Sequence, residues 1–126
     1  MKHKTFILLG RIVPKKNSRM IFVRGGRIVN IPSKKYQEWH KLASDQLIYQ
    51  GSLQIKIKVV VGIDIIFYFP DDRKKDMSNA AESIMDLLVD CKVIKDDCWQ
   101  VVNSLTLYAM RIDRKNPRAE VTIRYA

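Results

Sequence analysis

Five carboxylate side chains in the middle of the chain have the types and spacing of a metal-binding site. Glu82 and Asp86 are four residues apart in a segment with helical periodicity, so we expect them on one helix face. Asp76 lies just ahead of that helix, and Asp96 and Asp97 follow it, where the chain can turn back toward the same end. Carboxylate oxygens suit Mg²⁺, which usually shares its coordination shell with substrate phosphate. The sequence therefore predicts metal-assisted phosphodiester hydrolysis, in which the metal activates water and neutralises charge on the transferring phosphate.

Several of these acidic residues also have a purely structural interpretation. Asn79 with Glu82 three residues later matches a capping box, which would give Glu82 a role in starting the helix. Asp90 can be solvated helix surface, and Asp96-Asp97 can be an ordinary turn. Spacing alone leaves the catalytic and the structural interpretations open.

The acidic residues are concentrated within an otherwise basic chain. Eight of the thirteen Asp and Glu residues lie between Asp71 and Asp97, although the formal net charge of the chain is +10. From Met1 to Lys35 there are ten Lys and Arg residues and no acidic ones. Such a charge distribution is typical of a surface that meets phosphates, so nucleic acid is the leading partner. Composition alone also fits a merely soluble basic protein or one that binds anionic lipid.

The elements that must position these residues alternate along the chain. Strands are predicted at 6–13, 53–69, 101–112 and 120–125, with a hairpin over 20–30 that turns at Gly25-Gly26. Helices are predicted at 34–49, where Ser33 caps the start and Gly51 follows the end, and at 77–89. This order predicts a small α+β fold, with two main helices set against a mixed or mostly antiparallel sheet.

Length and composition limit the remaining possibilities. The 126 residues, 47% of them hydrophobic, suffice for a single domain spanning residues 1–126 around one core. The longest apolar run, 59–69, is interrupted by Gly62 and Asp64 and is too short to cross a bilayer. The chain has no signal-peptide pattern and only two cysteines, so we expect a cytoplasmic protein with structural thiols and no membrane association.

The acidic segment resembles the motif of the RusA-type Holliday junction resolvases. Asp76-Met77-Ser78-Asn79 is similar to that family's Asp-x-Asp-Asn element, and Asp86-Leu87-Leu88 is similar to its helix element. The closing Asp-Asp and Gln-Val element corresponds to Asp96-Asp97-Cys98-Trp99-Gln100-Val101. Near the N-terminus, Gly10-Arg11-Ile12-Val13-Pro14-Lys15-Lys16-Asn17-Ser18-Arg19 is similar to the family's first strand and basic loop. Together these motifs span most of the chain in the family's order.

The chain departs from the family pattern at two positions. Ser78 stands where the family has a carboxylate for metal, and Glu82 stands where the family commonly has a Lys that approaches the phosphate. We hypothesise that Glu82 supplies the missing metal ligand, with Lys74 or Lys75 as the nearby cation. An inactivated relative would carry the same two changes.

The last element can be aligned in two ways. The second metal-binding carboxylate falls on Asp97 when Asp96-Asp97 is taken as the pair, but on Cys98 when the count starts from Gln100-Val101. We favour Asp97, because a thiol is a poor Mg²⁺ ligand.

The resemblance implies an activity and a metal. Family members act as homodimers on four-way DNA junctions during recombination and repair, cutting two symmetry-related strands, and a two-fold protein suits a two-fold substrate. Asp76 and Asp97 would hold Mg²⁺, and Glu82 and Asp96 would support them. Asp86 would either orient a ligand or lie on the helix surface.

The resemblance also implies how DNA would be held. The basic loop would contact phosphates, which position DNA without reading bases, through Lys15, Lys16, Asn17 and Arg19. Phe22 in the hairpin is either a wedge at the junction centre or a core residue. Two other functions stay open: a non-cleaving DNA-binding module of the same fold, and a nuclease that acts on flaps or other branched DNA.

Overall fold

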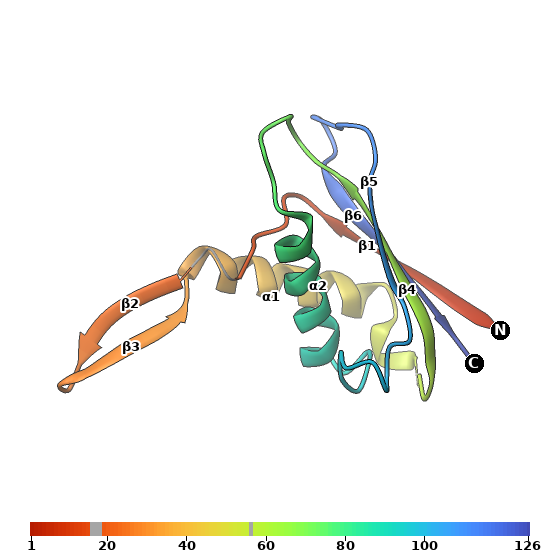
Figure 1. Ribbon diagram of the computed structural model, residues 1–126, viewed down its shortest axis with the longest axis horizontal. Coiled ribbons are helices and arrows are strands. Elements are labelled where there is room, and N and C mark those ends of the chain that lie inside the picture. The colour runs from red at the N-terminus through yellow and green to blue at the C-terminus, as the bar shows by residue number, and fades with distance from the viewer. Residues whose placement is uncertain (16–18, 56) are drawn as a thin grey trace.

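Two helices and a four-stranded sheet form the body of the protein, and a separate hairpin extends from it (Figure 1). The computed structural model describes residues 1–15, 19–55 and 57–126. The strands are β1 (Lys2–Leu9), β2 (Arg19–Arg24), β3 (Arg27–Pro32), β4 (Val60–Tyr68), β5 (Leu105–Ala109) and β6 (Arg118–Tyr125). The helices are α1 (Lys34–Tyr49), the 3₁₀ turn η1 (Ser52–Gln54) and α2 (Met77–Asp90).

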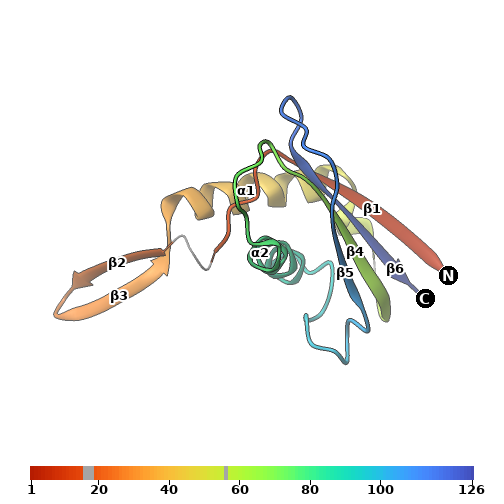
Figure 2. The ribbon, with the colours of Figure 1, turned by 45° about the horizontal axis from the view of Figure 1, so that its top comes forward.

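The sheet is mixed, with the strand order β1-β6-β4-β5. Strand β6 pairs antiparallel with both β1 and β4, whereas β5 pairs parallel to β4. Both helices lie on the same side of this sheet (Figures 1 and 2). The predicted α+β fold with a mixed sheet and two main helices is confirmed.

Alternating side chains along the strands build the core. In β6, and in β4 from Ile63 to Tyr68, every second residue points at the helices and is buried, which is the period of two that a half-covered sheet requires. The helices contribute residues three and four apart, so that one stripe of each meets the sheet. Fully buried side chains include Ile63, Ile65 and Phe67 of β4, Val121 and Ile123 of β6, Leu47 of α1, and Ile84, Leu87 and Leu88 of α2.

Helix α2 begins and ends at residues whose local contacts define its boundaries. The side chain of Asp76 caps its N-terminus by accepting hydrogen bonds from the backbone N–H groups of Ser78 and Asn79. At the other end Lys92 adopts a left-handed conformation, with φ of 59°, and the N–H of Val93 bonds back to the carbonyl of Leu88 at 2.9 Å. The chain after α2 is therefore folded back onto the helix end that it has just left.

Strand boundaries differ from the predicted ones where backbone geometry intervenes. The first strand ends at Leu9 and not at residue 13, because Gly10 has a φ of 88° and its N–H bonds to the carbonyl of Pro117. The predicted strand 53–69 is a strand only over β4, since η1 occupies its beginning. The predicted strand 101–112 is likewise shortened to β5. The predicted range of α1 matches the structure.

The β2–β3 hairpin projects away from the helices and the sheet (Figures 1 and 2). Gly25 and Gly26 both have positive φ, which is the conformation that a tight two-residue hairpin turn requires. Phe22 is 39% exposed and lies outside the core cluster, so its interpretation as a core residue is wrong. The described helices also include none long and apolar enough to span a membrane.

Ser83 connects α2 to the segment that follows β1. Its side chain is fully buried, donates to the carbonyl of Val13 at 2.9 Å and accepts from the N–H of Lys15 at 2.9 Å. Two backbone groups of an irregular segment are thereby satisfied by one hydroxyl. This contact fixes residues 13–15 beside α2.

We expect Ser83→Ala to lower the free energy of unfolding by about 1–3 kcal/mol, because it leaves a buried N–H and a buried carbonyl without their partner. Urea denaturation of the two proteins measures the difference. A loss well under about 0.5 kcal/mol, which is the scatter expected of neutral surface changes, would mean that this contact does not hold the segment.

Candidate functional site

A cavity of about 280 Å³ opens at the N-terminal end of α2. Its walls come from the segment after β1, the end of β4, the start of α2 and the start of β6. Its apolar lining includes Phe67 and Phe69, whereas its charged lining residues are mostly basic. The charged lining residues are Arg11, Lys35, Lys74, Lys75, Asp76 and Arg118.

Asp76 serves this cavity and the helix at the same time. Its Oδ1 atom accepts from the N–H of Ser78 at 3.0 Å and from the N–H of Asn79 at 3.2 Å, and the Ser78 hydroxyl donates to it at 2.6 Å. A carboxylate at a helix N-terminus is further stabilised by the helix dipole. Because Asp76 is the capping residue, the predicted Asn79–Glu82 capping box is wrong.

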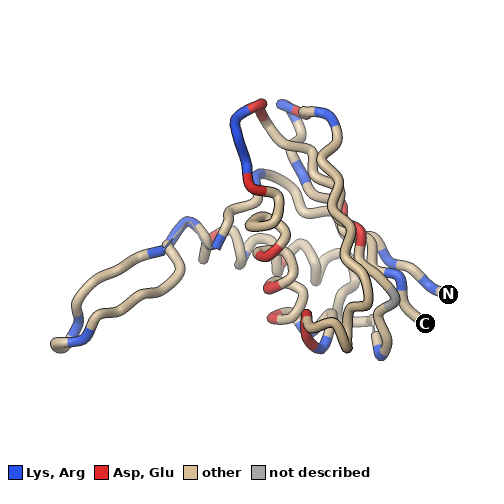
Figure 3. Tube along the Cα trace, in the orientation of Figure 1, with Lys and Arg blue, Asp and Glu red and all other residues tan. Residues whose placement is uncertain are grey.

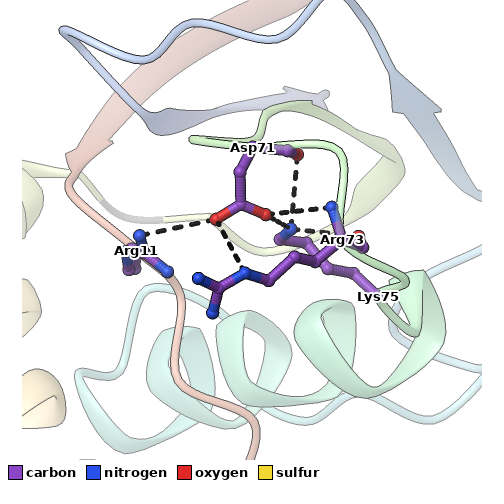
Figure 4. A network of polar contacts seen from close by, with 4 residues as sticks. All are labelled: Arg11, Asp71, Arg73 and Lys75. Atoms are coloured by element: carbon purple, nitrogen blue, oxygen red, sulfur yellow. Dashed lines mark hydrogen bonds and ion pairs between the residues drawn. The ribbon is translucent and has the colours of Figure 1, made fainter.

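Asp71 organises the basic side of the cavity (Figure 4). It forms an ion pair with Lys75 and accepts from the N–H of Arg73 at 3.1 Å, and Arg11 approaches it at 3.5 Å. The hydrogen bond from Lys75, followed by that from the Arg73 N–H, holds the pKa of Asp71 below its usual value. Sequence reasoning assigned Asp71 no role, although its spacing of four residues from Lys75 was a signal.

Lys74 and Lys75 are adjacent in sequence but differ in what they contact. The ammonium of Lys75 bonds the Asp71 carboxylate and the carbonyls of Asp71 and Arg73, and it lies 5.5 Å from the centroid of the Phe69 ring. Lys74 is exposed at the rim of the cavity. Lys74 is therefore the better placed of the two to meet a phosphate, and Lys75 the better placed to hold the loop.

Arg118, at the start of β6, lines the cavity and is held by a second group of ion pairs. Arg118 donates to Asp113 and to Glu120, both at 2.9 Å, and its guanidinium lies 3.8 Å from the centroid of the Tyr68 ring. The N–H of Asn116 and then Arg118 lower the pKa of Asp113. Sequence reasoning had assigned Arg118 no role; its partner Asp113 reaches it through the turn between β5 and β6, whereas Glu120 lies two residues away on β6.

The acidic face of α2 is partly paired with basic groups. The Lys15 ammonium lies 3.5 Å from Asp86. Asp90 is exposed, as expected of solvated helix surface, and it also contacts His40 at 2.9 Å. Glu82 is exposed.

The carboxylates of α2 also affect Tyr36 of α1. Burial of the Tyr36 side chain, and then the charges of the nearby carboxylates with Asp86 first, raise the pKa of Tyr36 to about 12.

Asp96 and Asp97 lie at the opposite end of α2 from Asp76. The 14 residues of α2 rise about 1.5 Å each, so its ends are roughly 20 Å apart. Figure 3 shows acidic positions at both ends of α2 and along the helix between them. The expectation that these carboxylates converge within one chain is wrong, because buried Val93 and Ile94 hold the following loop at the C-terminal end.

The described residues contain no group of three His, Cys, Asp or Glu side chains that could hold a metal ion. Each end of α2 instead presents part of the predicted set: Asp76 at one end, and Asp96 with Asp97 at the other. Asp96 Oδ1 accepts from the N–H of Asp97 at 2.8 Å, and both residues are exposed.

The predicted phosphate-binding residues of the basic loop are only partly described. Lys15 is tied to α2 through Ser83 and Asp86, and Arg19 donates to the side chain and carbonyl of Asn30, both at 3.0 Å. Lys16 and Asn17 lie outside the described residues.

Comparison with known protein families identifies the fold. The model of the endodeoxyribonuclease RusA family matches residues 10–124, which is nearly the whole of the 126-residue chain. The chain belongs to the RusA endodeoxyribonuclease family. The resemblance seen in the short motifs is thereby confirmed, and membership in a family of endonucleases supports nuclease activity. No curated protein matches the chain at a significant level.

The contrast between the two neighbouring lysines of this RusA family member gives a test. We expect Lys74→Ala to weaken DNA binding and to reduce the slope of log affinity against log salt by about 1, as for one lost phosphate contact. Lys75→Ala should instead lower the denaturation midpoint, because Asp71 loses its main partner. Fluorescence anisotropy with labelled junction DNA over a salt series, together with thermal melts, separates the two effects. Equal binding losses without a stability difference would contradict these assignments.

Proposed function

We propose that this RusA family member is a divalent-metal-dependent endonuclease that cuts four-way DNA junctions as a homodimer, with Mg²⁺ as the metal. The observation that carries the proposal is Asp76, a carboxylate set in the basic cavity at the start of α2. A carboxylate surrounded by Arg11, Lys74 and Arg118 matches a site in which a metal and basic side chains share a phosphate group.

Carboxylate oxygens are suitable ligands for a hard cation such as Mg²⁺. Within one protomer, however, the predicted ligands lie at opposite ends of α2. Asp76 and Asp97 are roughly 20 Å apart along α2, so they can share an ion only if two protomers contribute one end each. A two-fold axis that passes beside the middle of α2, perpendicular to the helix, would make two α2 helices antiparallel neighbours, so that Asp76 of one protomer faces Asp97 of the other. We propose this shared arrangement, with Glu82 and Asp96 as supporting ligands.

Capping does not prevent Asp76 from binding a metal. An ionised carboxylate offers about four lone-pair positions, so a carboxylate that accepts capping hydrogen bonds at Oδ1, as Asp76 does, can also offer oxygen to a metal ion. When bound, a divalent ion would supply an activated water and neutralise charge on the phosphate. Lys74 and Arg11 would bind the flanking phosphates, and the ion pair with Asp71 would keep Lys75 and its loop in place.

A non-cleaving DNA-binding module is the second candidate, and the surroundings of Ser78 favour it. The Ser78 hydroxyl donates to Asp76 at a position where the family pattern has another carboxylate. The negative charge at this point is thereby reduced, and Glu82 must compensate for it if cutting is retained. A nuclease activity on flaps is a variant of the first candidate, and it differs from junction cutting only in the DNA substrate.

We expect Asp76→Asn to abolish Mg²⁺-dependent cutting of a four-way junction while leaving the fold intact, because Asn caps a helix about as well as Asp. Asp45→Asn removes the same charge from an exposed position on α1 and should cut like the parent protein. The measurement is cleavage of labelled four-way, flap and linear duplex DNA with and without Mg²⁺, together with circular dichroism. Cutting by Asp76→Asn at the parental rate, or no cutting by the parent protein, would refute the proposal.

A further inference from the structure

The outer edge of β5 carries unpaired backbone groups in a regular pattern. The carbonyl of Ser104 accepts from Ile63 at 2.9 Å, and the N–H of Met110 donates to Phe67 at 3.0 Å, so both residues face β4. Because the direction alternates along a strand, Leu105, Leu107 and Ala109 direct their N–H and carbonyl groups away from β4. No described strand pairs with this side of β5, which lies at the border of the sheet in Figure 2.

The other edge of the same sheet is closed by side chains. On β1, the N–H and carbonyl of Ile7 bond the amide of Gln50 at 2.7 and 2.8 Å, and the N–H of Leu9 bonds Gln46 at 2.7 Å. Gln46 of α1 and Gln50, which caps the end of that helix, thus replace a neighbouring strand. The β5 edge differs, since Leu105 is 44% exposed and Tyr108 is 47% exposed, and β5 contains no charged residue that would discourage pairing.

We propose that the β5 edge pairs antiparallel with β5 of a second copy of this chain, centred on Leu107, to form a continuous eight-stranded sheet across the dimer. This inference rests on the homodimer of the proposed function and assigns its interface. The outward residues are self-complementary in this register, because Leu107 faces its own copy and Leu105 faces Ala109 of the partner. These three opposed pairs would exchange about six backbone hydrogen bonds.

Charge favours a second copy over DNA at this edge. An uncharged strand with exposed Leu105, Tyr108 and Met110 offers nothing to phosphate, whereas an apolar border suits a protein interface. The loop beyond β5, 111–118, has four basic residues against one acidic, whereas the segment 91–104 that leads into β5 has two basic and two acidic residues. Antiparallel pairing places the basic loop beyond β5 of one protomer beside the neutral segment that leads into β5 of the other, so the two basic loops stay apart. It also sets the two α2 helices antiparallel on one side of the joined sheet.

Disulfide trapping tests the register directly. In a Cys91→Ser, Cys98→Ser background, Leu105→Cys and Ala109→Cys are made as separate proteins. The proposed pairing brings position 105 of one protomer within about 5.5 Å, Cα to Cα, of position 109 of the other, which suits a disulfide. Two copies of position 109 would be roughly 13 Å apart, too far for one. Leu42→Cys, exposed on α1, is the matched control.

We expect covalent dimers after mild oxidation of the Leu105→Cys and Ala109→Cys mixture, and essentially none from either protein alone or from a Leu42→Cys and Ala109→Cys mixture. Sedimentation equilibrium of the uncrosslinked background protein should show a dimer. A dimer that does not crosslink in the mixture, or a monomer at all concentrations, would overturn the β5 interface. Junction cutting by the parent protein is measured separately, so a failure of this interface is distinguishable from a failure of the nuclease proposal.

Discussion

The packing of α2 against the sheet determines where every carboxylate of the acidic segment lies. Ile84, Leu87 and Leu88 are fully buried, and this fixes the rotation of the helix so that Glu82 and Asp86 face away from the core. The Asp76 cap and the left-handed turn at Lys92 fix the length of the helix, which places Asp76 at the basic cavity and Asp96 with Asp97 at the far end. A metal site that uses carboxylates from both ends of α2 therefore requires two protomers as well as suitable side chains.

The basic cavity is held by ion pairs whose partners come from distant segments. Asp71 draws together Arg11, Arg73 and Lys75, while Asp113 and Glu120 hold Arg118 over the ring of Tyr68. These carboxylates reduce the number of basic groups available to a phosphate, yet they set the positions of those that remain. Lys74 remains exposed at the rim, and Asp76 is positioned by its own role as the helix cap.

Much of the fold could be predicted from the sequence because its signals are local. The helical spacing and the Ser33 cap located α1, and Gly25-Gly26 located the hairpin turn, because each depends on a few adjacent residues. The strand ends were less accurate, since the tertiary contact of Gly10 with Pro117 has no local signal. The prediction that Asp76 and Asp97 converge was wrong for the same reason. Residue spacing shows which side chains share a helix face, but it does not show that burial of Val93 and Ile94 places the next loop at the far end of the helix. The motifs themselves indicated the family correctly.

The central claim of a metal site shared between protomers is tested most directly by mixing two inactive variants. Asp76→Asn and Asp97→Asn proteins are each assayed alone and then after unfolding and refolding together, with labelled junction DNA and Mg²⁺. In a shared site, the mixed dimer combines an intact Asp76 from one chain with an intact Asp97 from the other. The mixture is therefore predicted to regain cutting at one of its two sites and to produce singly nicked junctions. If the mixture stays as inactive as its components while the refolded parent protein cuts, the two carboxylates do not act together across a dimer.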